Sequence, residues 1–251
     1  MTAQSPPRPL VIAHRGASFD LPENTLPAIA RAREVGADRI EVDVHRTRDG
    51  VVVVHHDEDL ARSAGIPRRI ADSTLAELER IPLAKLAAGQ VGAAPTIPTL
   101  RAALASAGPV PLVVELKEIA GASGESVAEF VRAVLADVDA AGAAACTSLI
   151  SFSDAIVAAA LPALGPDRVG AIRGSDNGPH AWRDLERSPT SLVVVSRKIA
   201  TPDVVTRIAR AGKRVFVYAL DDADSVRAYA AAGAAGIISN RPDVALAALR
   251  G

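Results

Sequence analysis

The chain has 251 residues, of which 49% are hydrophobic, and its formal net charge is −1. This composition is typical of a globular protein with a sizeable core, and α/β barrels of this length commonly form one domain. Basic and acidic residues number 28 and 29, and aromatic residues make up only 3%, which argues against a nucleic-acid-binding surface.

The N-terminal segment MTAQSPPRPL lacks the basic start and apolar run of a signal peptide. Its three prolines lead us to expect a disordered lead-in over residues 1–8, followed by a single domain over 9–251. No stretch of the sequence approaches the ~18 uninterrupted apolar residues of a membrane span. The single cysteine, Cys146, cannot form a disulfide within the chain. We therefore expect a cytoplasmic location.

Eight short runs rich in β-branched residues recur along the chain, with Ala-rich helical segments between them. They are PLVIAH from Pro9, RIEVDV from Arg39, PLVVEL from Pro111, TSLISF from Thr147, RVGAIR from Arg168, SLVVVS from Ser191, RVFVYA from Arg214 and AGIIS from Ala235. Eight strand and helix repeats without a strong linker predict a closed TIM (β/α)8 barrel, because open sheets more often have five or six strands.

One stretch, from Asp57 to Pro109, is too long for a simple crossover between strands. It contains two predicted helices, STLAELERI, which opens with a Thr74/Glu77 capping box, and PTLRAALASAG. We therefore predict a small inserted subdomain, at approximately 57–109, between the second and third barrel strands and over the barrel mouth. The preceding DGVVVVHHD predicts a hairpin extension of the second strand.

Acidic residues lie at the C-terminal ends of the second and third predicted strands, where barrels of this kind place their active sites. Glu41 and Asp43 are two residues apart and share a face, as do Glu115 and Lys117. Three converging carboxylates repel one another, and one divalent cation with oxygen ligands, Mg²⁺ or Ca²⁺ or else Mn²⁺, relieves that repulsion. The alternative is that the acids form buried salt bridges with Lys or Arg.

Two histidines end neighbouring strands: His14 precedes Arg15, and His56 precedes Asp57. Such a pair supplies the base and the acid that metal-assisted phosphoryl chemistry needs. Arg15 and Lys117 are suited to bind an anion, so these residues together predict a phosphate ester as substrate.

These motifs resemble those of the glycerophosphodiester phosphodiesterase family. The similarity includes His14-Arg15-Gly16, Pro22-Glu23-Asn24-Thr25, Glu41-x-Asp43, Asp49-Gly50 and His56-Asp57, then IPTL from Ile97, VELK from Val114, Ser151-Phe152 and GIISNRPD from Gly236. The resemblance covers nearly the whole chain. It implies a metal-dependent barrel enzyme that cleaves small-molecule glycerophosphodiesters to glycerol 3-phosphate and an alcohol such as choline or ethanolamine.

The resemblance also implies residue roles. It makes Glu41, Asp43 and Glu115 the metal ligands, His14 and His56 the general acid and base in an order left open, Arg15 and Lys117 the phosphate contacts, and Glu23, Asn24 and Asp57 supports of the loops around them. A helix-capping role for Asn24 is the alternative at that position. The nucleophile is also left open, because related enzymes allow the glycerol hydroxyl of the substrate to attack phosphorus and give a cyclic phosphate.

Two departures from the family pattern lie in the C-terminal half. Tyr218-Ala219-Leu220-Asp221 stands where relatives usually have Trp-Thr-x-Asn, and Ser239-Asn240 stands where they usually have Thr-Asp. We expect neither to touch the metal or histidine set, and both to alter the alcohol pocket. Candidate pocket residues are Phe19, Phe152, Arg173, Lys198 and Tyr218, with Trp182 as a further aromatic.

Two other functions fit the sequence less well. One is a lysophospholipase D-like phosphodiesterase of the same superfamily, but the sequence offers no apolar membrane-docking segment. The other is a non-catalytic phosphate- or metal-binding barrel, which does not require both histidines. The sequence leaves the metal, the alcohol and a homo-oligomeric state open.

Overall fold

The computed structural model describes residues 8–83, 94–118 and 123–250. Residues 1–7, which make up most of the expected lead-in, and residues 84–93, within the expected insertion, lie outside the described residues. Arg8, the last residue of the expected lead-in, pairs with Asp38 at 2.6 Å.

All eight predicted strands are present. They are β1 (Leu10–His14), β2 (Arg39–Arg46), β6 (Leu112–Leu116), β7 (Ser148–Ser151), β8 (Val169–Arg173), β9 (Leu192–Ser196), β10 (Arg214–Tyr218) and β11 (Gly236–Ser239). Parallel pairing runs in the order β1-β11-β10-β9-β8-β7-β6-β2, and β1 also pairs with β2. The last pairing closes the sheet, so the predicted TIM barrel is confirmed.

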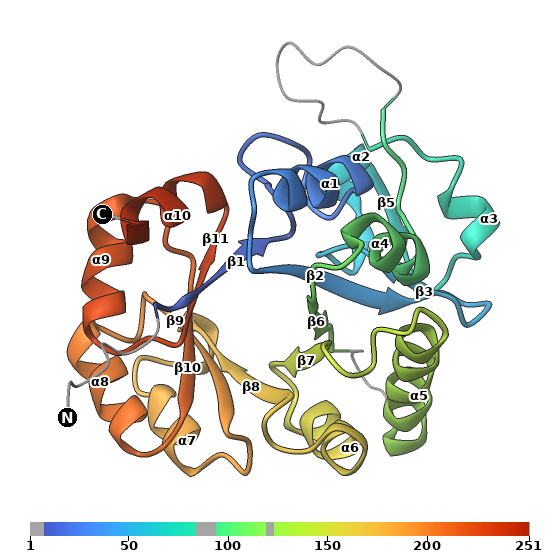
Figure 1. Cartoon of the computed structure of the whole chain (residues 1–251). Helices are drawn as coiled ribbons and strands as arrows, with labels where there is room; N and C mark the ends of the chain where they lie inside the picture. The colour runs from blue at the N-terminus through green and yellow to red at the C-terminus, as the bar shows by residue number, and fades with distance from the viewer. Residues whose placement is uncertain (1–7, 84–93, 119–122, 251) are drawn as a thin grey trace.

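A helix follows each barrel strand before the next one begins. These helices are α1 (Leu26–Glu34), α4 (Leu100–Ala107), α5 (Gly124–Ala140), α6 (Asp154–Leu164), α7 (Trp182–Arg187), α8 (Pro202–Arg210), α9 (Ala223–Ala231) and α10 (Pro242–Arg250). They stand outside the strands, with α7 to α10 on one side and α1, α4, α5 and α6 on the other (Figure 1). Their start signals are local, since Thr25 caps α1 and Asp222 caps α9.

The inside of the barrel is filled by apolar side chains from nearly every strand. This cluster consists of Ile12, Val113, Ile150, Ile172, Leu192, Val194, Phe216 and Ile238. Among the described residues, β2 adds no side chain to it, because Ile40, Val42 and Val44 belong to the outer core beneath the helices. The alternate residues of β2, Glu41 and Asp43, consequently face inward.

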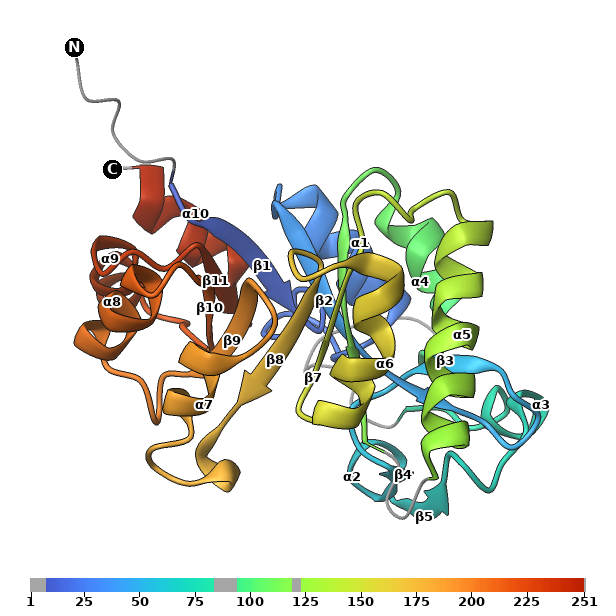
Figure 2. The same cartoon turned by 90° about the horizontal axis from the view of Figure 1, so that it is seen from below.

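The insertion begins with β3 (Val52–Val54), which pairs antiparallel with the end of β2 and confirms the expected hairpin. It continues through β4 (Asp59–Leu60), α2 (Ala61–Ala64), β5 (Ile66–Arg69) and α3 (Leu75–Leu78). Its own small core contains Val53, Leu60, Ile70, Leu78, Leu83 and Ile97. In Figure 2 these elements lie together at one end of the molecule, away from α8 to α10.

Helix α4, which the sequence analysis grouped with the insertion, is part of the barrel. It packs against α1 and α5, its Leu100, Ala103 and Ala107 belong to the outer core, and it joins the insertion to β6. The amphipathic pattern of this segment predicts a helix but does not say which core its apolar face joins.

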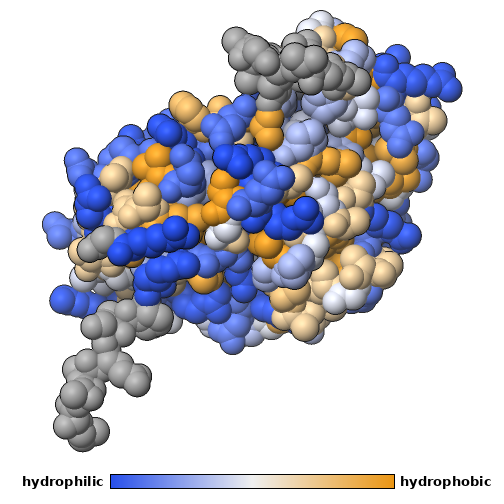
Figure 3. Space-filling model, turned by 45° about the horizontal axis from the view of Figure 1, so that its top comes forward, coloured by the Kyte–Doolittle hydropathy of each residue, from blue (hydrophilic) through white to orange (hydrophobic). Residues whose placement is uncertain are grey.

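The described helices include none long and apolar enough to cross a membrane. Figure 3 shows one face of the molecule, on which apolar residues are interspersed with strongly hydrophilic ones. Large apolar side chains at the surface include Phe19, Leu26 and Ile66, and scattered exposure of this kind is ordinary for a folded protein.

The barrel interior gives a first prediction. Phe216 is fully enclosed, so Phe216→Ala leaves a cavity and should lower the free energy of unfolding by about 3–5 kcal/mol in chemical denaturation. Phe19→Ala is the matched control, because Phe19 is 63% exposed, and should change stability by less than about 1 kcal/mol. Equal effects of the two substitutions would contradict the assignment of Phe216 to the core.

Candidate active site

Strand register brings the acidic residues together. Asp43 on β2 lies opposite Glu115 on β6, and Glu41 on β2 lies opposite His14 on β1. Paired residues of parallel strands point to the same side of the sheet. One carboxylate oxygen from each of Glu41, Asp43 and Glu115 lies within 4.8 Å of the other two, and all three residues are buried.

Two cationic side chains contact this carboxylate cluster. Lys117 Nζ lies 2.7 Å from Asp43 Oδ1 and also binds Glu115 Oε1, while Arg15 Nε lies 3.1 Å from Asp43 Oδ2. Salt bridges, the alternative considered from the sequence, therefore account for Asp43 and for part of Glu115. They do not account for Glu41, whose Oε1 is buried without a hydrogen-bond partner in the part of the chain that the structure describes.

The pKa values of the three acids diverge. Burial, reinforced by the charges of Asp43 and Glu115, raises the pKa of Glu41 well above its usual range. Burial also raises the pKa of Glu115, to about 7, against the opposing charge of Lys117. Burial would also raise the pKa of Asp43, but the charges of Lys117 and Arg15 outweigh burial and lower the pKa of that carboxyl. The positive charge of Arg15 and Lys117 therefore offsets burial at Asp43 but not at Glu41 and Glu115.

The donor set of this cluster fits a hard divalent cation. All three residues supply carboxylate oxygen, the ligand type of Mg²⁺, Ca²⁺ and Mn²⁺, and Glu41 keeps one buried oxygen without a hydrogen-bond partner among the described residues. Glu41, Asp43 and Glu115 are therefore the described residues that could hold a metal ion.

The loop after β1 aims Arg15 at the cluster. Arg15 and Asn24 both adopt left-handed backbone conformations, with φ 57° and 58°, and Asn24 N donates a hydrogen bond to the Arg15 carbonyl at 3.0 Å. Between them, a Cβ on Gly16 would lie 2.6 Å from the carbonyl carbon of Ala28. Only glycine lets the loop pass this close to α1.

Asn24 holds Asp43 in place rather than capping the helix. Its Nδ2 donates to Asp43 Oδ2 at 2.8 Å, and its Oδ1 accepts from Asp43 N at 3.2 Å. The neighbouring Thr25 provides the cap of α1, since its hydroxyl oxygen accepts from Ala28 N. The capping alternative for Asn24 is therefore wrong.

His14 contacts a residue that the sequence analysis set apart from the site. Asn240 Oδ1 lies 2.7 Å from His14 Nδ1, and Asn240 Nδ2 donates to Asp221 Oδ2 at 2.7 Å. The backbone N of Asn240 donates to the same carboxylate. The expectation that neither departure touches the histidines is wrong, because the ends of β10 and β11 meet beside β1.

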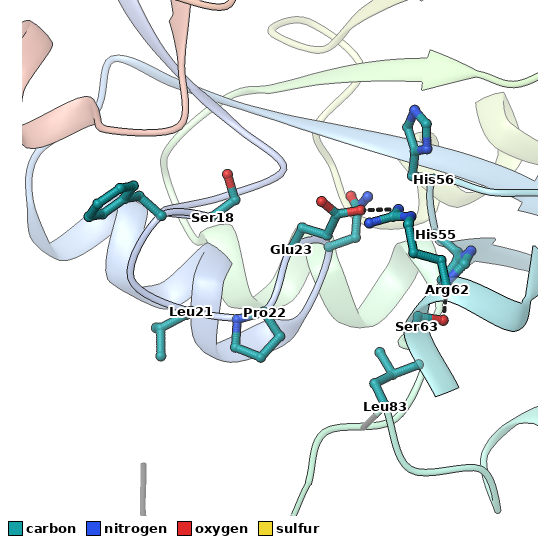
Figure 4. Close-up of a pocket in the computed structure, with 11 residues that line it drawn as sticks. Ser18, Leu21, Pro22, Glu23, His55, His56, Arg62, Ser63 and Leu83 are labelled. Atoms are coloured by element: carbon teal, nitrogen blue, oxygen red, sulfur yellow. Dashed lines mark hydrogen bonds and ion pairs between the residues drawn. The ribbon is translucent and has the colours of Figure 1, made fainter. Parts of the chain in front are cut away.

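His56 belongs to a chain of charged groups that joins the insertion to the barrel. His56 Nδ1 lies 2.7 Å from Asp57 Oδ1, and Arg62 on α2 binds both Asp57 and Glu23 at 2.5 Å. Glu23 in turn accepts from Arg15 at 3.1 Å. Figure 4 shows the Arg62 side chain reaching Glu23 across the space between the two loops.

A cavity of about 490 Å³ opens at the barrel mouth. Its lining includes His14, Arg15, Glu41, His56, Glu115 and Lys117 together with the candidate pocket residues Phe152, Lys198 and Tyr218. Gly174 makes room for Tyr218, because a Cβ there would lie 2.6 Å from the tyrosine hydroxyl.

The other candidate pocket residues lie elsewhere. Arg173 binds Asp154 at 2.7 Å, and Phe19 lines a separate, second cavity. Trp182 is buried beneath Arg207, whose guanidinium carbon lies 5.0 Å from the ring centre. None of the three is among the described residues that line the barrel mouth.

Sequence reasoning did not find Arg62, Asp221 or Asn240 as parts of the site. Arg62 follows Asp57 by five residues, within reach of a side-chain ion pair, so a search for a cationic partner of Asp57 could have found it. Asn240 and His14 are 226 positions apart. Their contact depends on the closing pair β1–β11, with Ala13 opposite Ser239.

The fold and the site define a class, that of (β/α)8 barrels with a buried carboxylate cluster, two histidines and two cationic side chains at the carboxyl ends of the strands. A model of the Glycerophosphoryl diester phosphodiesterase family matches residues 14–244. The chain belongs to this family.

Individual relatives agree with this assignment. A glycerophosphodiester phosphodiesterase of Caldanaerobacter subterraneus subsp. tengcongensis is 47% identical over 91 residues, which cover 36% of this chain and 37% of that protein. Human glycerophosphodiester phosphodiesterase 1 is 40% identical over 95 residues, which cover 38% of this chain and 29% of that protein. These matches span 37% and 29% of the length of the two relatives.

The crystal structure of a protein from Silicibacter pomeroyi DSS-3, described as a glycerophosphoryl diester phosphodiesterase, superposes with a TM-score of 0.87. The identity is 26%, and the match covers 98% of this chain and 94% of that one. The shared architecture therefore extends over the barrel as a whole.

The carboxylate cluster yields a stability prediction. In EDTA and mildly alkaline buffer, Glu41→Gln should raise the free energy of unfolding by about 1–3 kcal/mol, because an amide can donate to the neighbouring carboxylates whereas Glu41 Oε1 has no partner. The same substitution should remove the rise in melting temperature that Mg²⁺, Ca²⁺ or Mn²⁺ gives the unaltered protein.

The control is Glu129→Gln, which alters an exposed pair with Arg46 and should leave the effect of the cation on melting unchanged. If no divalent cation shifts the melting temperature of the unaltered protein, the cluster is a salt-bridge network and not a metal site.

Proposed function

We propose that this chain is a metal-dependent phosphodiesterase that hydrolyses glycerophosphodiesters to glycerol 3-phosphate and an alcohol. The observation that carries the proposal is a single cavity lined by both histidines, both phosphate-binding candidates and two of the three clustered carboxylates, Glu41 and Glu115. Membership in the family supports the same reaction class.

The charges at the site suit a divalent cation and a phosphodiester together. Three carboxylates meet two cationic side chains that contact them, Arg15 and Lys117, so an ionised Glu41 or Glu115 would repel the phosphate of a substrate. A divalent cation held by Glu41, Asp43 and Glu115 would add positive charge to the cavity and would supply a Lewis acid for the negative charge that develops on the phosphate. Arg15 and Lys117 supply further positive charge to the phosphate.

The hydrogen-bond partners of the two histidines differ in a way that supports different roles for them. Because Asn240 donates its amide hydrogens to Asp221, its Oδ1 faces His14 and must accept a hydrogen bond from His14 Nδ1. His14 therefore presents an unprotonated Nε2, 3.9 Å from Glu41 Oε2. This tautomer makes His14 the general base.

His56 has the environment of the acid. Its Nδ1 faces the carboxylate of Asp57, which stabilises an imidazolium, whereas an asparagine amide does not. Burial lowers the pKa of both imidazoles, to about 4 for His14, but the charge of Asp43 and the Asp57 hydrogen bond oppose this effect at His56. Of the two, His56 is the better proton donor.

In the proposed reaction, His14 Nε2 takes the proton of the nucleophile as its oxygen bonds to phosphorus. The bond from phosphorus to the alcohol oxygen breaks, and His56 gives that oxygen a proton. The nucleophile is water or the glycerol hydroxyl of the substrate. The second route forms a cyclic phosphate that water then opens, so both routes give glycerol 3-phosphate.

The proposal is tested by release of glycerol 3-phosphate from glycerophosphocholine and glycerophosphoethanolamine. The purified protein is stripped with EDTA and resupplied with Mg²⁺, Ca²⁺ or Mn²⁺ in turn. We expect activity to vanish with EDTA and to return with at least one cation. Full activity in EDTA would refute the metal dependence, and no release from any glycerophosphodiester would refute the proposed function.

Substitution of either histidine should greatly reduce turnover. His14→Gln and His56→Gln should each lower kcat by at least about 10²-fold with the fold intact by circular dichroism, the usual loss for a general acid or base. His180→Gln, in an exposed loop, is the matched control and should retain full activity. Near-normal turnover in either site variant would remove that histidine from the mechanism.

Asn240 should act by positioning His14. Asn240→Leu removes the acceptor that fixes the tautomer and should lower kcat by about 10- to 100-fold with little change in KM. The exchanged pair Asp221→Asn with Asn240→Asp restores an acceptor and a partner for it, and should recover most of that loss. Equal loss in the exchanged pair and in Asn240→Leu would show that the contact merely packs the strand ends.

A further inference from the structure

A second cavity adjoins the barrel mouth at His56, which lines both. It has a volume of about 330 Å³, within the range of small-molecule sites. The β1–α1 loop provides Leu21 and Pro22, and the insertion provides Ser63 and Leu83 on the facing side (Figure 4). No step of the proposed reaction so far uses this side cavity.

The exposed lining of the side cavity is more apolar than polar, although Ser18, Asn24, Ser63 and the two histidines His55 and His56 also contribute to it. Its apolar lining residues are Phe19, Leu21, Pro22 and Leu83. The charged groups that line it, Glu23 and Arg62, bind each other at 2.5 Å.

A cationic head group would have little to bind here. The Glu23 carboxylate is already paired with two arginines, Arg15 and Arg62. The Phe19 ring, which a quaternary ammonium would use, already carries Arg241, whose guanidinium carbon lies 4.4 Å from the ring centre. The side cavity therefore suits an uncharged apolar group.

Beyond the carboxylate cluster, the barrel-mouth cavity has a mixed lining in which polar side chains lie beside apolar ones such as Phe152 and Ile172. Ser175, Asp176, Ser196 and Lys198 line it, and these side chains can hydrogen-bond the free hydroxyls of a glycerol group. With the phosphate at Arg15 and Lys117, the glycerol half of a substrate fits the barrel mouth, and the other ester oxygen then faces His56.

We propose that the side cavity binds the leaving alcohol and that this alcohol is uncharged with an apolar body, rather than choline or ethanolamine. The proposal rests on the proposed function and names its substrate class. It places His56, the proposed acid, where the two cavities meet, beside the alcohol oxygen that needs a proton.

The test uses glycerol 3-phosphate esters of straight-chain alcohols from ethyl to hexyl. These alcohols are nearly equal as leaving groups, so differences in kcat/KM report binding. We expect kcat/KM to rise about threefold for each added methylene that is buried. In the carbon isostere of choline, carbon replaces the quaternary nitrogen. The glycerol 3-phosphate ester of this isostere should have a KM at least about fivefold lower than that of glycerophosphocholine.

A pair of variants locates the effect. Leu21→Trp fills the side cavity and should lower kcat/KM for the hexyl ester by at least about tenfold, while the ethyl ester stays within about threefold. Ile66→Trp adds the same bulk at an exposed position of the insertion and should change neither value.

The outcomes separate this proposal from the proposed function. Activity on all glycerophosphodiesters without dependence on chain length, or with a preference for choline over its isostere, overturns the side-cavity proposal and leaves the phosphodiesterase standing. Hydrolysis of lysophosphatidylcholine together with a Leu21→Trp defect on that substrate places the acylglycerol half in the side cavity and also overturns it. No hydrolysis of any ester refutes the proposed function itself.

Discussion

Three carboxylates on the inner wall of the barrel are the constraint around which the rest of the site is arranged. Strand β2 gives its apolar residues to the outer core and its acids to the interior, where burial penalises each negative charge. Each neighbouring element contributes a side chain that offsets part of this penalty. Lys117 comes from the end of β6, Arg15 from a left-handed turn after β1, and Asn24 from the start of α1.

These contacts pair the three carboxylates only in part, and the incomplete pairing matters for the chemistry that the site could perform. Asp43 is held from both sides, whereas Glu41 keeps an oxygen without a hydrogen-bond partner among the described residues. Fully paired acids would form an inert network, while fully unpaired acids would take up protons. The intermediate arrangement leaves carboxylate oxygens that could hold a cation, beside cationic side chains that could attract a phosphate.

The sequence allowed much of this to be predicted because the signals were local. Alternation along β2 places Glu41 and Asp43 on one face, and the strand and helix periods give the barrel. What could not be predicted depends on long-range closure. Asn240 reaches His14 only because β11 pairs with β1, and α4 joins the barrel only because its apolar face meets α1 and α5. Arg173 ends a strand like the site residues, yet it turns to Asp154.

The separate core of the insertion has a consequence for how the protein loses activity on heating. Leu60, Ile70 and Leu78 pack among themselves, so the insertion is a smaller cooperative unit than the barrel and opens at lower free energy. Arg62 belongs to the insertion and binds Asp57, and Asp57 in turn contacts His56. We therefore expect turnover to fail on heating when the insertion opens, below the temperature at which the barrel unfolds.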